Sequence, residues 1–357
     1  MKALYRNAKV LILDEPTAVL TPSEVDNLFD TLNILRNQGT SIVIITHKLY
    51  ETMSLADRVA VLRDGEMIRN DVRPADTNVV ELSNMMVGRP IKLDIRHHAK
   101  NIGEPYLCVQ NLTMFDERGV EKLKDISFNI RKGEIYGIAG VEGNGQTQLL
   151  EALTGIAKPK SMQLELGGKK LSGDAHFFIH NKVGHVPEDR SSMGLVAQMS
   201  IRENLILGYH DFPDMQKHGF VKQDHVRKYA DKAISDYMIK TPNMELPVRS
   251  LSGGNQQKVV MARVLNRDLD FLVVAHPTRG IDIGSSEYMH EKILEFRDEG
   301  KAVLLISADL DEVYTLSDRL AVIFDGKIVT ECEPETFSKV QLGLLMTGTP
   351  LETVMEV

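Results

Sequence analysis

The sequence lacks the features of a secreted or membrane-spanning chain. Its 357 residues include no tryptophan and only two cysteines, Cys108 and Cys332, so no disulfide framework is expected and a reducing cytoplasm fits. The longest apolar runs, such as VLILD and AVLLIS, fall far short of the ~20 residues that a transmembrane helix needs. Any association with a membrane is therefore expected to be peripheral.

Basic charge is also scarce. There are 42 Lys and Arg residues against 50 Asp and Glu residues, which gives a formal net charge of -8 and a pI near 5.8. Nucleic acids and anionic membranes are bound through strongly basic surfaces, so no nucleic-acid partner is expected. What the sequence does contain is 43% apolar and 26% charged residues, a composition typical of globular proteins, over a length that suits two domains with separate cores.

An internal repeat organises the sequence. Three pairs of similar, ungapped segments share one offset of 261 residues: VLILDEPTAVLTPSE and FLVVAHPTRGIDIGS begin at positions 10 and 271, SIVIITHKLYE and AVLLISADLDE at 41 and 302, and ADRVAVLRDGEMI and SDRLAVIFDGKIV at 56 and 317. A period of this length corresponds to a whole domain, so it predicts a tandem duplication.

The first copy is predicted to be incomplete. The second copy contains two motifs, GVEGNGQT at Gly140 and LSGGNQQ at Leu251. An offset of 261 residues would put their first-copy counterparts at positions -121 and -10, before Met1. We therefore expect the C-terminal part of a longer protein. The expected boundaries are an incomplete first domain over 1–90, a linker over 91–105, a second domain over 106–345 and a C-terminal tail over 346–357.

The order of the expected elements predicts an α/β fold. Residues 10–13 predict a strand, and Thr21 and Glu24 form a capping box for a helix that Gly39 ends. The run SIVIIT at 41–46 is apolar throughout, as is typical of a buried parallel strand. Strand, helix, strand and helix in this order indicate α/β layers joined by right-handed crossovers.

A glycine-rich octet predicts a phosphate-binding loop. GVEGNGQT fits the pattern G-x-x-x-x-G-K-[ST], except that glutamine replaces the lysine that neutralises phosphate charge. Alone, the octet would favour a plain glycine turn, but an expected strand before it and a helix after it favour the phosphate loop. The candidate nucleotide-binding residues are Gly140, Gly143, Asn144, Gly145, Gln146 and Thr147, and the Thr147 hydroxyl is also a candidate Mg²⁺ ligand.

An acid pair follows the first expected strand. Asp14 suits a Mg²⁺ ligand, and Glu15 suits a base that polarises an attacking water molecule. His47 follows the next strand, where an imidazole could contact a γ-phosphate. Taken alone, the two acids would equally suit a solvated strand end, and the histidine would suit a structural role. Their place in the repeat favours a catalytic role for all three. The second copy has Ala275 in place of the aspartate. It also lacks the glutamate, the histidine and the lysine of the phosphate loop, and these four losses together predict that it does not hydrolyse nucleotide.

The second copy also differs from the first at the positions of Glu15 and His47, which agrees with a lack of nucleotide hydrolysis. His276 and Ala308 stand in the second copy where the first has Glu15 and His47.

The motif LSGGNQQ lies at the start of an expected helix, where free N–H groups attract an anion such as a γ-phosphate, although an ordinary serine cap would have the same pattern. Its candidate nucleotide-binding residues are Ser252, Gly253, Gly254 and Gln256.

Together these motifs resemble the ABC transporter ATPases and, more closely, the tandem ATPase subunits of bacterial simple-sugar and nucleoside importers. The segments DEPTAVLTP, ITHKL, GVEGNGQT, HVPEDR, LSGGNQQK and PTRGID carry the resemblance over essentially the whole chain, and DEPTAVLTP with NMMVGR favours the nucleoside branch. The resemblance implies a P-loop NTPase fold, ATP and Mg²⁺ as cofactors, and a place at the cytoplasmic side of the membrane. The implied partners are transmembrane permease subunits and an extracytoplasmic substrate-binding lipoprotein.

The resemblance also implies composite sites between two domains. Asp14, Glu15 and His47 would belong to the competent site, facing Ser252 to Gly254, while the Gly140 loop would belong to a degenerate one. It further implies a coupling position at Glu188, an interdomain loop aspartate at Asp282 (Thr21 in the first copy) and an adenine-stacking ring at Phe115.

The expected function is that of an ATP-hydrolysing importer subunit that is inactive alone, because neither composite site is complete. The upstream half of its own first domain is an expected partner. Two alternatives stay open: a non-catalytic module that a separately encoded upstream half completes, and a soluble ABC ATPase unconnected with transport. The first domain is also expected to expose apolar sheet surface and to associate.

Overall fold

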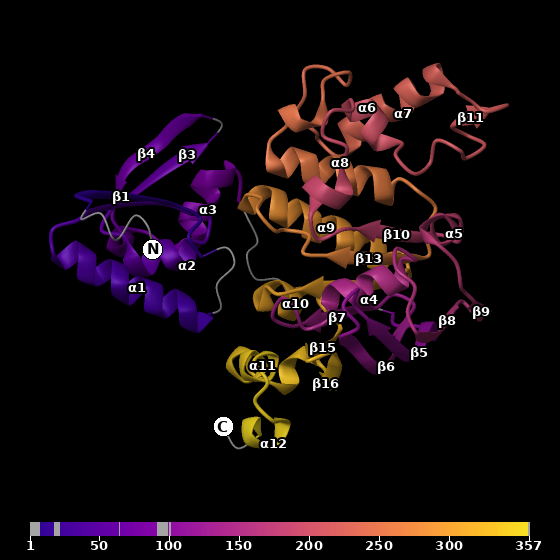
Figure 1. Ribbon diagram of the computed structural model, residues 1–357. Coiled ribbons are helices and arrows are strands. Elements are labelled where there is room, and N and C mark those ends of the chain that lie inside the picture. The colour runs from indigo at the N-terminus through magenta and orange to yellow at the C-terminus, as the bar shows by residue number, and fades with distance from the viewer. Residues whose placement is uncertain (1–7, 18–21, 64, 91–98, 100, 356–357) are drawn as a thin grey trace. The chain divides into compact units, whose positions relative to one another are not determined.

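The computed structural model describes residues 8–17, 22–63, 65–90, 99 and 101–355 (Figure 1). The chain divides into two compact units. The first unit comprises Met1–Leu93 with Asp282–Glu287, and the second comprises Asp94–Ile281 with Tyr288–Val357. The expected helix cap at Thr21 and most of the expected linker lie outside the described residues.

The second unit contains two sheets. The larger has the strand order β10 (Val183–Val186), β13 (Phe271–Ala275), β14 (Ala302–Ser307), β7 (Ile135–Ala139), β15 (Arg319–Phe324) and β16 (Lys327–Cys332), parallel except for β16. The smaller is antiparallel, in the order β6 (Glu121–Arg131), β5 (Pro105–Phe115), β8 (Ser161–Leu166) and β9 (Lys169–Lys170). A short hairpin pairs β11 (Gln216–Lys217) with β12 (Phe220–Val221).

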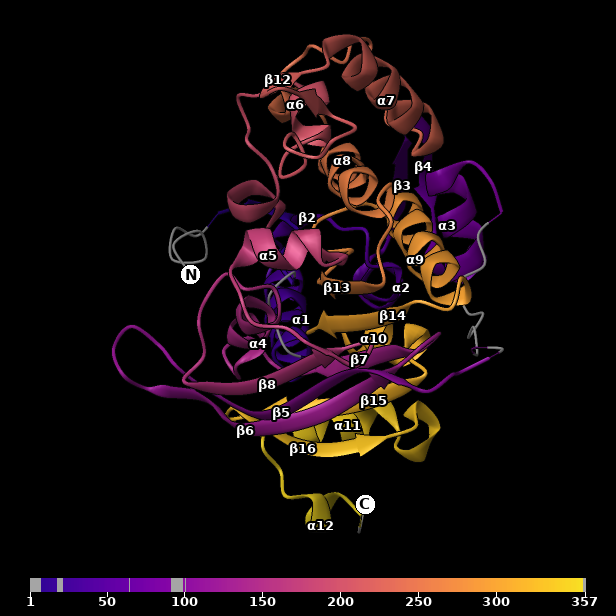
Figure 2. The ribbon, with the colours of Figure 1, turned by 90° about the vertical axis from the view of Figure 1, so that its right-hand side faces the viewer.

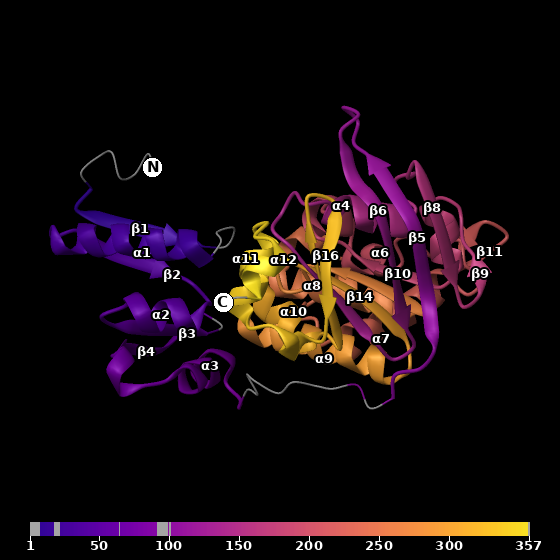
Figure 3. The same cartoon turned by 90° about the horizontal axis from the view of Figure 1, so that it is seen from below.

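Helices cover both faces of the parallel sheet. α4 lies on one face, and α8 and α9 lie on the other. The described α-helices after β7 are α4 (Gln146–Leu153), α5 (Ala175–His180), α6 (Ile201–Leu205), α7 (Gln223–Asp236), α8 (Gly253–Leu265), α9 (Ile283–Asp298), α10 (Leu310–Leu316), α11 (Lys339–Met346) and α12 (Leu351–Val354). In Figure 2 α6, α7 and α8 lie at the top of the view, above β13 and β14, and β5, β6 and β8 of the antiparallel sheet run across its lower half. Figure 3 shows β5, β6 and β8 side by side. None of the helices in the described part of the chain combines the length and apolar character that a membrane span requires.

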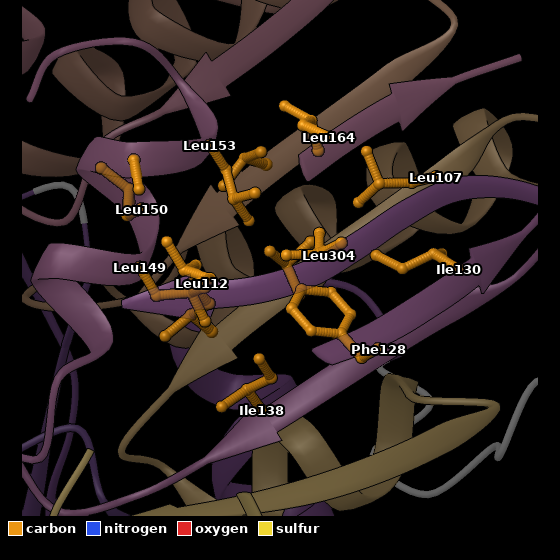
Figure 4. Close-up of a cluster of buried hydrophobic side chains, with 14 of the residues drawn as sticks. Leu107, Leu112, Phe128, Ile130, Ile138, Leu149, Leu150, Leu153, Leu164 and Leu304 are labelled. Atoms are coloured by element: carbon orange, nitrogen blue, oxygen red, sulfur yellow. The ribbon is translucent and has the colours of Figure 1, made fainter. Parts of the chain in front are cut away.

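The core explains why the central strands have continuous apolar sequences. β7, β13 and β14 are buried along their whole lengths, because side chains on both faces meet a packed layer. On one face, Leu304 of β14 and Ile138 of β7 belong to a core that α4 and the antiparallel sheet complete. Figure 4 shows this core, with Leu149 contributed by α4 and Phe128 by β6. On the other face α8 and α9 close a second core. The expected tail also packs, since Val354 is fully buried.

The first unit is smaller and contains two separate two-stranded sheets. β1 (Val10–Asp14) pairs in parallel with β2 (Ser41–Ile45), and β3 (Val59–Arg63) pairs antiparallel with β4 (Glu66–Val72). Its helices are α1 (Pro22–Asn37), α2 (Leu49–Leu55) and α3 (Val79–Val87). The helix expected before Gly39 and both expected strands are therefore confirmed.

The repeat seen in the sequence recurs in the element bounds. Shifted by 261 residues, β1 gives the bounds of β13, α1 those of α9, and α2 those of α10. The surroundings differ, however. In the second unit β7 joins β14 to β15, whereas no strand among the described residues of the first unit joins β2 to β3.

One face of the first unit's parallel sheet is consequently exposed. Ile12 and Val43 are 67% and 50% exposed, whereas their counterparts Val273 and Leu304 are 0% exposed beneath α4 and the antiparallel sheet. The prediction of a parallel strand at 41–46 is right, but the prediction that it is buried is wrong, because no described residue covers that face. The expected exposure of apolar sheet surface is confirmed.

Candidate functional site

The acid pair and the histidine meet at the ends of β1 and β2. Asp14 is the last residue of β1 and is exposed. Glu15 follows with a φ of 43°, and its N–H donates to the Ile45 carbonyl at 2.8 Å. His47 Nδ1 lies 3.0 Å from Glu15 Oε1. Two residues separated by 32 positions in the sequence thus form one carboxylate–imidazole pair, as expected for neighbouring parallel strands.

A hydrogen bond from a buried threonine joins the turn after β1 to α2. Thr17, 1% exposed, donates from Oγ1 to Glu51 Oε1 at 2.6 Å, and Lys48 Nζ donates to the Thr17 carbonyl at 3.2 Å. No local pattern in the sequence marks this contact. The repeat could have revealed it, because Thr278 donates to Glu312 at 2.7 Å in the second unit.

The second unit keeps the turn and loses the acids. His276 has a φ of 46°, and its N–H donates to the Ile306 carbonyl at 2.8 Å. Burial lowers the pKa of this imidazole, whose Nδ1 accepts from the Ala308 N–H at 3.3 Å. With Ala275 before it, this strand end presents no carboxylate for a metal ion and none for a water molecule.

The glycine-rich loop has the backbone form of a phosphate loop. It connects β7 to α4, and Gly143 and Gly145 adopt φ values of 95° and 108° that favour glycine. A Cβ at Gly140 would approach Gln146 Nε2 to 2.6 Å, so the loop is too tight there for a side chain. The first N–H groups of α4 face the loop, which is the arrangement that attracts a phosphate.

The Gln146 side chain occupies the inside of this loop. It is 6% exposed, and its Nε2 donates to the Val141 carbonyl at 2.9 Å. Its Oε1 is buried without a hydrogen-bond partner among the described residues. Asn144 Nδ2 donates to the same Val141 carbonyl at 3.0 Å. The backbone thus has the turn of a phosphate loop, but the Gln146 amide occupies its inside and brings no positive charge.

One glutamate of the loop, Glu142, and one beside it, Glu188, share an arginine. Thr147 Oγ1 donates to Glu188 Oε2 at 3.4 Å, so the candidate Mg²⁺ hydroxyl is directed to a carboxylate. Arg279 bridges Glu188 and Glu142 at 2.9 and 2.8 Å. Glu188, expected at a coupling position, is thus part of an ion-paired cluster at the degenerate loop.

The LSGG segment caps a helix. Ser252 is the N-cap of α8, where its hydroxyl oxygen accepts from Asn255, and Gly253 and Gly254 are the first residues of that helix. Arg190 passes close by, since a Cβ at Gly253 would lie 2.7 Å from its guanidinium. Gln256 Nε2 donates to the Leu251 carbonyl at 3.1 Å. The motif therefore forms the expected helix start, and its role toward an anion stays a prediction.

The remaining candidates have local partners. Asp282 caps the first turn of α9, accepting from the Ser285 N–H at 2.9 Å and from its hydroxyl at 2.8 Å. Phe115 ends β5 and is 37% exposed, with Lys160 Nζ 4.9 Å from its ring centroid. The ammonium group covers one face of the ring that the resemblance assigned to adenine.

Comparisons with known proteins agree with this geometry. The sequence profile described as ABC transporter matches residues 123–279. The nucleoside import ATP-binding protein NupA of Lactococcus lactis is 42% identical over 98% of this chain and 69% of the relative. The chain belongs to the ABC transporter ATP-binding protein family. The guanosine import ATP-binding protein NupO of Bacillus subtilis is 43% identical, over 98% of this chain and 68% of the relative.

A solved structure confirms the fold of this ABC ATP-binding protein. The dimeric structure of MJ0796, a bacterial ABC transporter cassette, superimposes with a TM-score of 0.56 and 22% identity, over 64% of this chain and 98% of that one. The expected P-loop NTPase α/β fold is therefore confirmed. The comparisons show one ABC cassette, and residues 123–279, which the sequence profile matches, lie within the second unit.

Proposed function

We propose that this ABC ATP-binding protein energises the import of a nucleoside or a simple sugar by binding and hydrolysing ATP. The relatives NupA and NupO, named for nucleoside and guanosine import, support this transport role. The observation that carries the hydrolytic part is the 3.0 Å contact between Glu15 and His47 at the strand ends. The permease subunits and the substrate-binding lipoprotein expected from the resemblance would then be its partners at the cytoplasmic side of the membrane.

Within the first unit, Glu15 is the proposed general base. Its carboxylate is 40% exposed, so a water molecule can reach it, while His47 and the turn hold its direction. Asp14 offers an exposed carboxylate suited to a hard cation. Bound Mg-ATP would supply the γ-phosphoryl group and the charge that neutralises it.

We further propose that this site needs a phosphate loop from outside the described first unit. The exposed face of β1 and β2 matches the face that α4 and the antiparallel sheet cover in the second unit. A polypeptide with counterparts of β7 and α4 would cover this face and bring its loop to the carboxyl ends of the strands, where Glu15 lies. Without that polypeptide the chain is expected not to turn over ATP.

Phosphate release tests the hydrolytic role. The chain alone should release no phosphate, whereas a longer chain that includes an in-frame upstream phosphate loop should be active. In the active form, Glu15→Gln should reduce kcat by about 100-fold or more, because a general base contributes at least that much. The matched control is His276→Gln, the equivalent position of the second unit, which should keep activity. Activity of the isolated chain that is lost on Glu15→Gln would refute the incomplete site.

Uptake tests the transport role. Cells that lack this chain should lose uptake of labelled guanosine or ribose, and the wild-type gene should restore it. If uptake of nucleosides and of sugars is unaffected while Glu15-dependent ATPase activity remains, the importer assignment is wrong and the hydrolytic site stands.

A further inference from the structure

A cluster of three metal-ligating side chains lies outside the nucleotide sites. His176 and His180 are one helical turn apart on α5, and Asp211 comes from the segment after α6. All three belong to the second unit, where α5 leads into β10 of the parallel sheet and Asp211 lies between α6 and the β11–β12 hairpin (Figure 1).

We propose that these residues form a binding site for a divalent transition-metal ion of the Zn²⁺ type. His176 Nε2 lies 2.8 Å from Asp211 Oδ2, His180 Nε2 lies 3.2 Å from the same oxygen, and the two Nε2 atoms are 3.1 Å apart. Tetrahedral zinc with ligand bonds of about 2.0–2.1 Å separates its ligand atoms by about 3.3 Å. The three atoms therefore need to move apart by only a few tenths of an ångström, roughly, to accept the ion.

Hydrogen bonding alone does not satisfy this cluster. Each neutral imidazole presents either one N–H or one lone pair at Nε2, so at most two of the three close contacts can be hydrogen bonds at once. Asp211 Oδ1 is in addition buried and without a hydrogen-bond partner among the described residues.

Neighbouring residues hold the ligands in place. The His180 ring stacks on Phe212 with centroids 4.4 Å apart and an interplanar angle of 10°. The Arg267 guanidinium lies 5.6 Å from the Phe212 centroid and donates to the Ile179 carbonyl at 2.6 Å. The two segments that carry the ligands are thus joined by contacts independent of a metal ion, which pre-organises the site.

The ligand set selects the class of ion. Two imidazole nitrogens and one carboxylate oxygen suit Zn²⁺ and its neighbours in the Irving–Williams order rather than Mg²⁺ or Ca²⁺, which prefer oxygen ligands. The ligands His176 and His180 are accessible to solvent, so a water molecule would complete the tetrahedron. The ion would tie α5, and through it β10, to the segment after α6, and it would be independent of the nucleotide sites.

Calorimetric titration of the full chain with Zn²⁺ tests the proposal. The wild-type chain should bind one equivalent. His176→Asn and Asp211→Asn should each weaken Zn²⁺ binding by at least about tenfold. Removing a residue that only hydrogen-bonds to a ligand already lowers metal affinity by about that factor, and removing the ligand itself should lower it at least as much. His225→Asn, which changes an exposed histidine on α7, should leave the affinity unchanged.

Folding must be separated from binding in this test. Circular dichroism and melting without metal should match between the wild type and Asp211→Asn, which keeps the size and one oxygen of the side chain. A second readout is the visible spectrum of bound Co²⁺, which should show tetrahedral coordination in the wild type and lose it in both variants. Absence of stoichiometric Zn²⁺ binding, or binding that both ligand variants retain, would overturn the proposal.

Discussion

Glu15 and His276 adopt the same left-handed conformation in two repeats, although only one of them carries a carboxylate. A non-glycine residue in this region costs about 1–3 kcal/mol and persists only where its surroundings impose it. In both repeats the residue's N–H donates to the neighbouring strand, and a part-buried threonine–glutamate hydrogen bond begins two residues later in the sequence. The fold therefore imposes the turn, and the contact with His47, not the strain, distinguishes Glu15, the proposed general base, from His276.

At the same scale, His185 makes the stability of the second unit depend on pH. It lies in β10, its Nε2 is buried without a hydrogen-bond partner among the described residues, and burial lowers its pKa from 6.5 to about 4. Between pH 7 and pH 5 the unfolded chain takes up a proton that the folded chain does not, so stability should fall as the pH falls. The contribution of this residue is about 2 kcal/mol.

Urea unfolding of the second unit at pH 7 and pH 5 measures this effect. His185→Gln should reduce the difference in the free energy of unfolding between pH 7 and pH 5 by about 2 kcal/mol. His225→Gln, at an exposed site, should leave this difference unchanged. An equal fall in the wild type and in His185→Gln would show that other groups cause it.

At the scale of elements, the exposed face of β1 and β2 predicts opposite results for two matched substitutions. Ile12→Thr replaces an exposed apolar residue, so it should reduce self-association and hydrophobic-dye binding with little change in stability. Val273→Thr, at the equivalent position of β13, should destabilise the second unit by about 1–3 kcal/mol, because it buries a hydroxyl group. Light scattering and urea unfolding measure the two effects. A loss of stability from Ile12→Thr as large as that from Val273→Thr would show that this face is covered.

These elements also show how far the sequence could predict the molecule. Local signals in the sequence predict several elements. Apolar runs predict β1 and β2, an apolar period with caps predicts α1, and glycine spacing predicts the loop between β7 and α4. The burial of β2 was not, since an apolar run does not show whether its covering layer is present. The inward direction of the Gln146 side chain depends on its rotamer, which no local pattern encodes.

Contacts between distant residues were the least predictable part of the site. The Thr17–Glu51 bond joins positions 34 residues apart, and only its recurrence in the repeat marks it. The spacing of His176 and His180 is a local helical signal, but Asp211 joins them only through the packing of α5 against the segment after α6. Pattern analysis therefore finds single residues more readily than the partners that give them a function.

At the scale of the whole molecule, the two units should differ in the protection of equivalent strands against hydrogen exchange. In the second unit β14 pairs on both sides, with β13 and β7, so its amides should exchange only on global unfolding. In the first unit β2 pairs with β1 among the described strands, so local opening should release its amides. Protection in β2 should therefore be lower than in β14 by about 100-fold or more, which corresponds to about 2.7 kcal/mol.

Extending the chain with a polypeptide that carries a phosphate loop should change this pattern selectively. Its strand would take the place beside β2 that β7 takes beside β14, and its helix would cover Ile12 and Val43. Exchange at Ser41–Ile45 should then slow, while exchange in β14 stays the same because β14 already pairs with β13 and β7. Mass spectrometry of peptides from β2 and β14 provides the comparison within one sample. Equal protection of the two strands in the chain alone would contradict an incomplete first unit, whatever the ATPase assay shows.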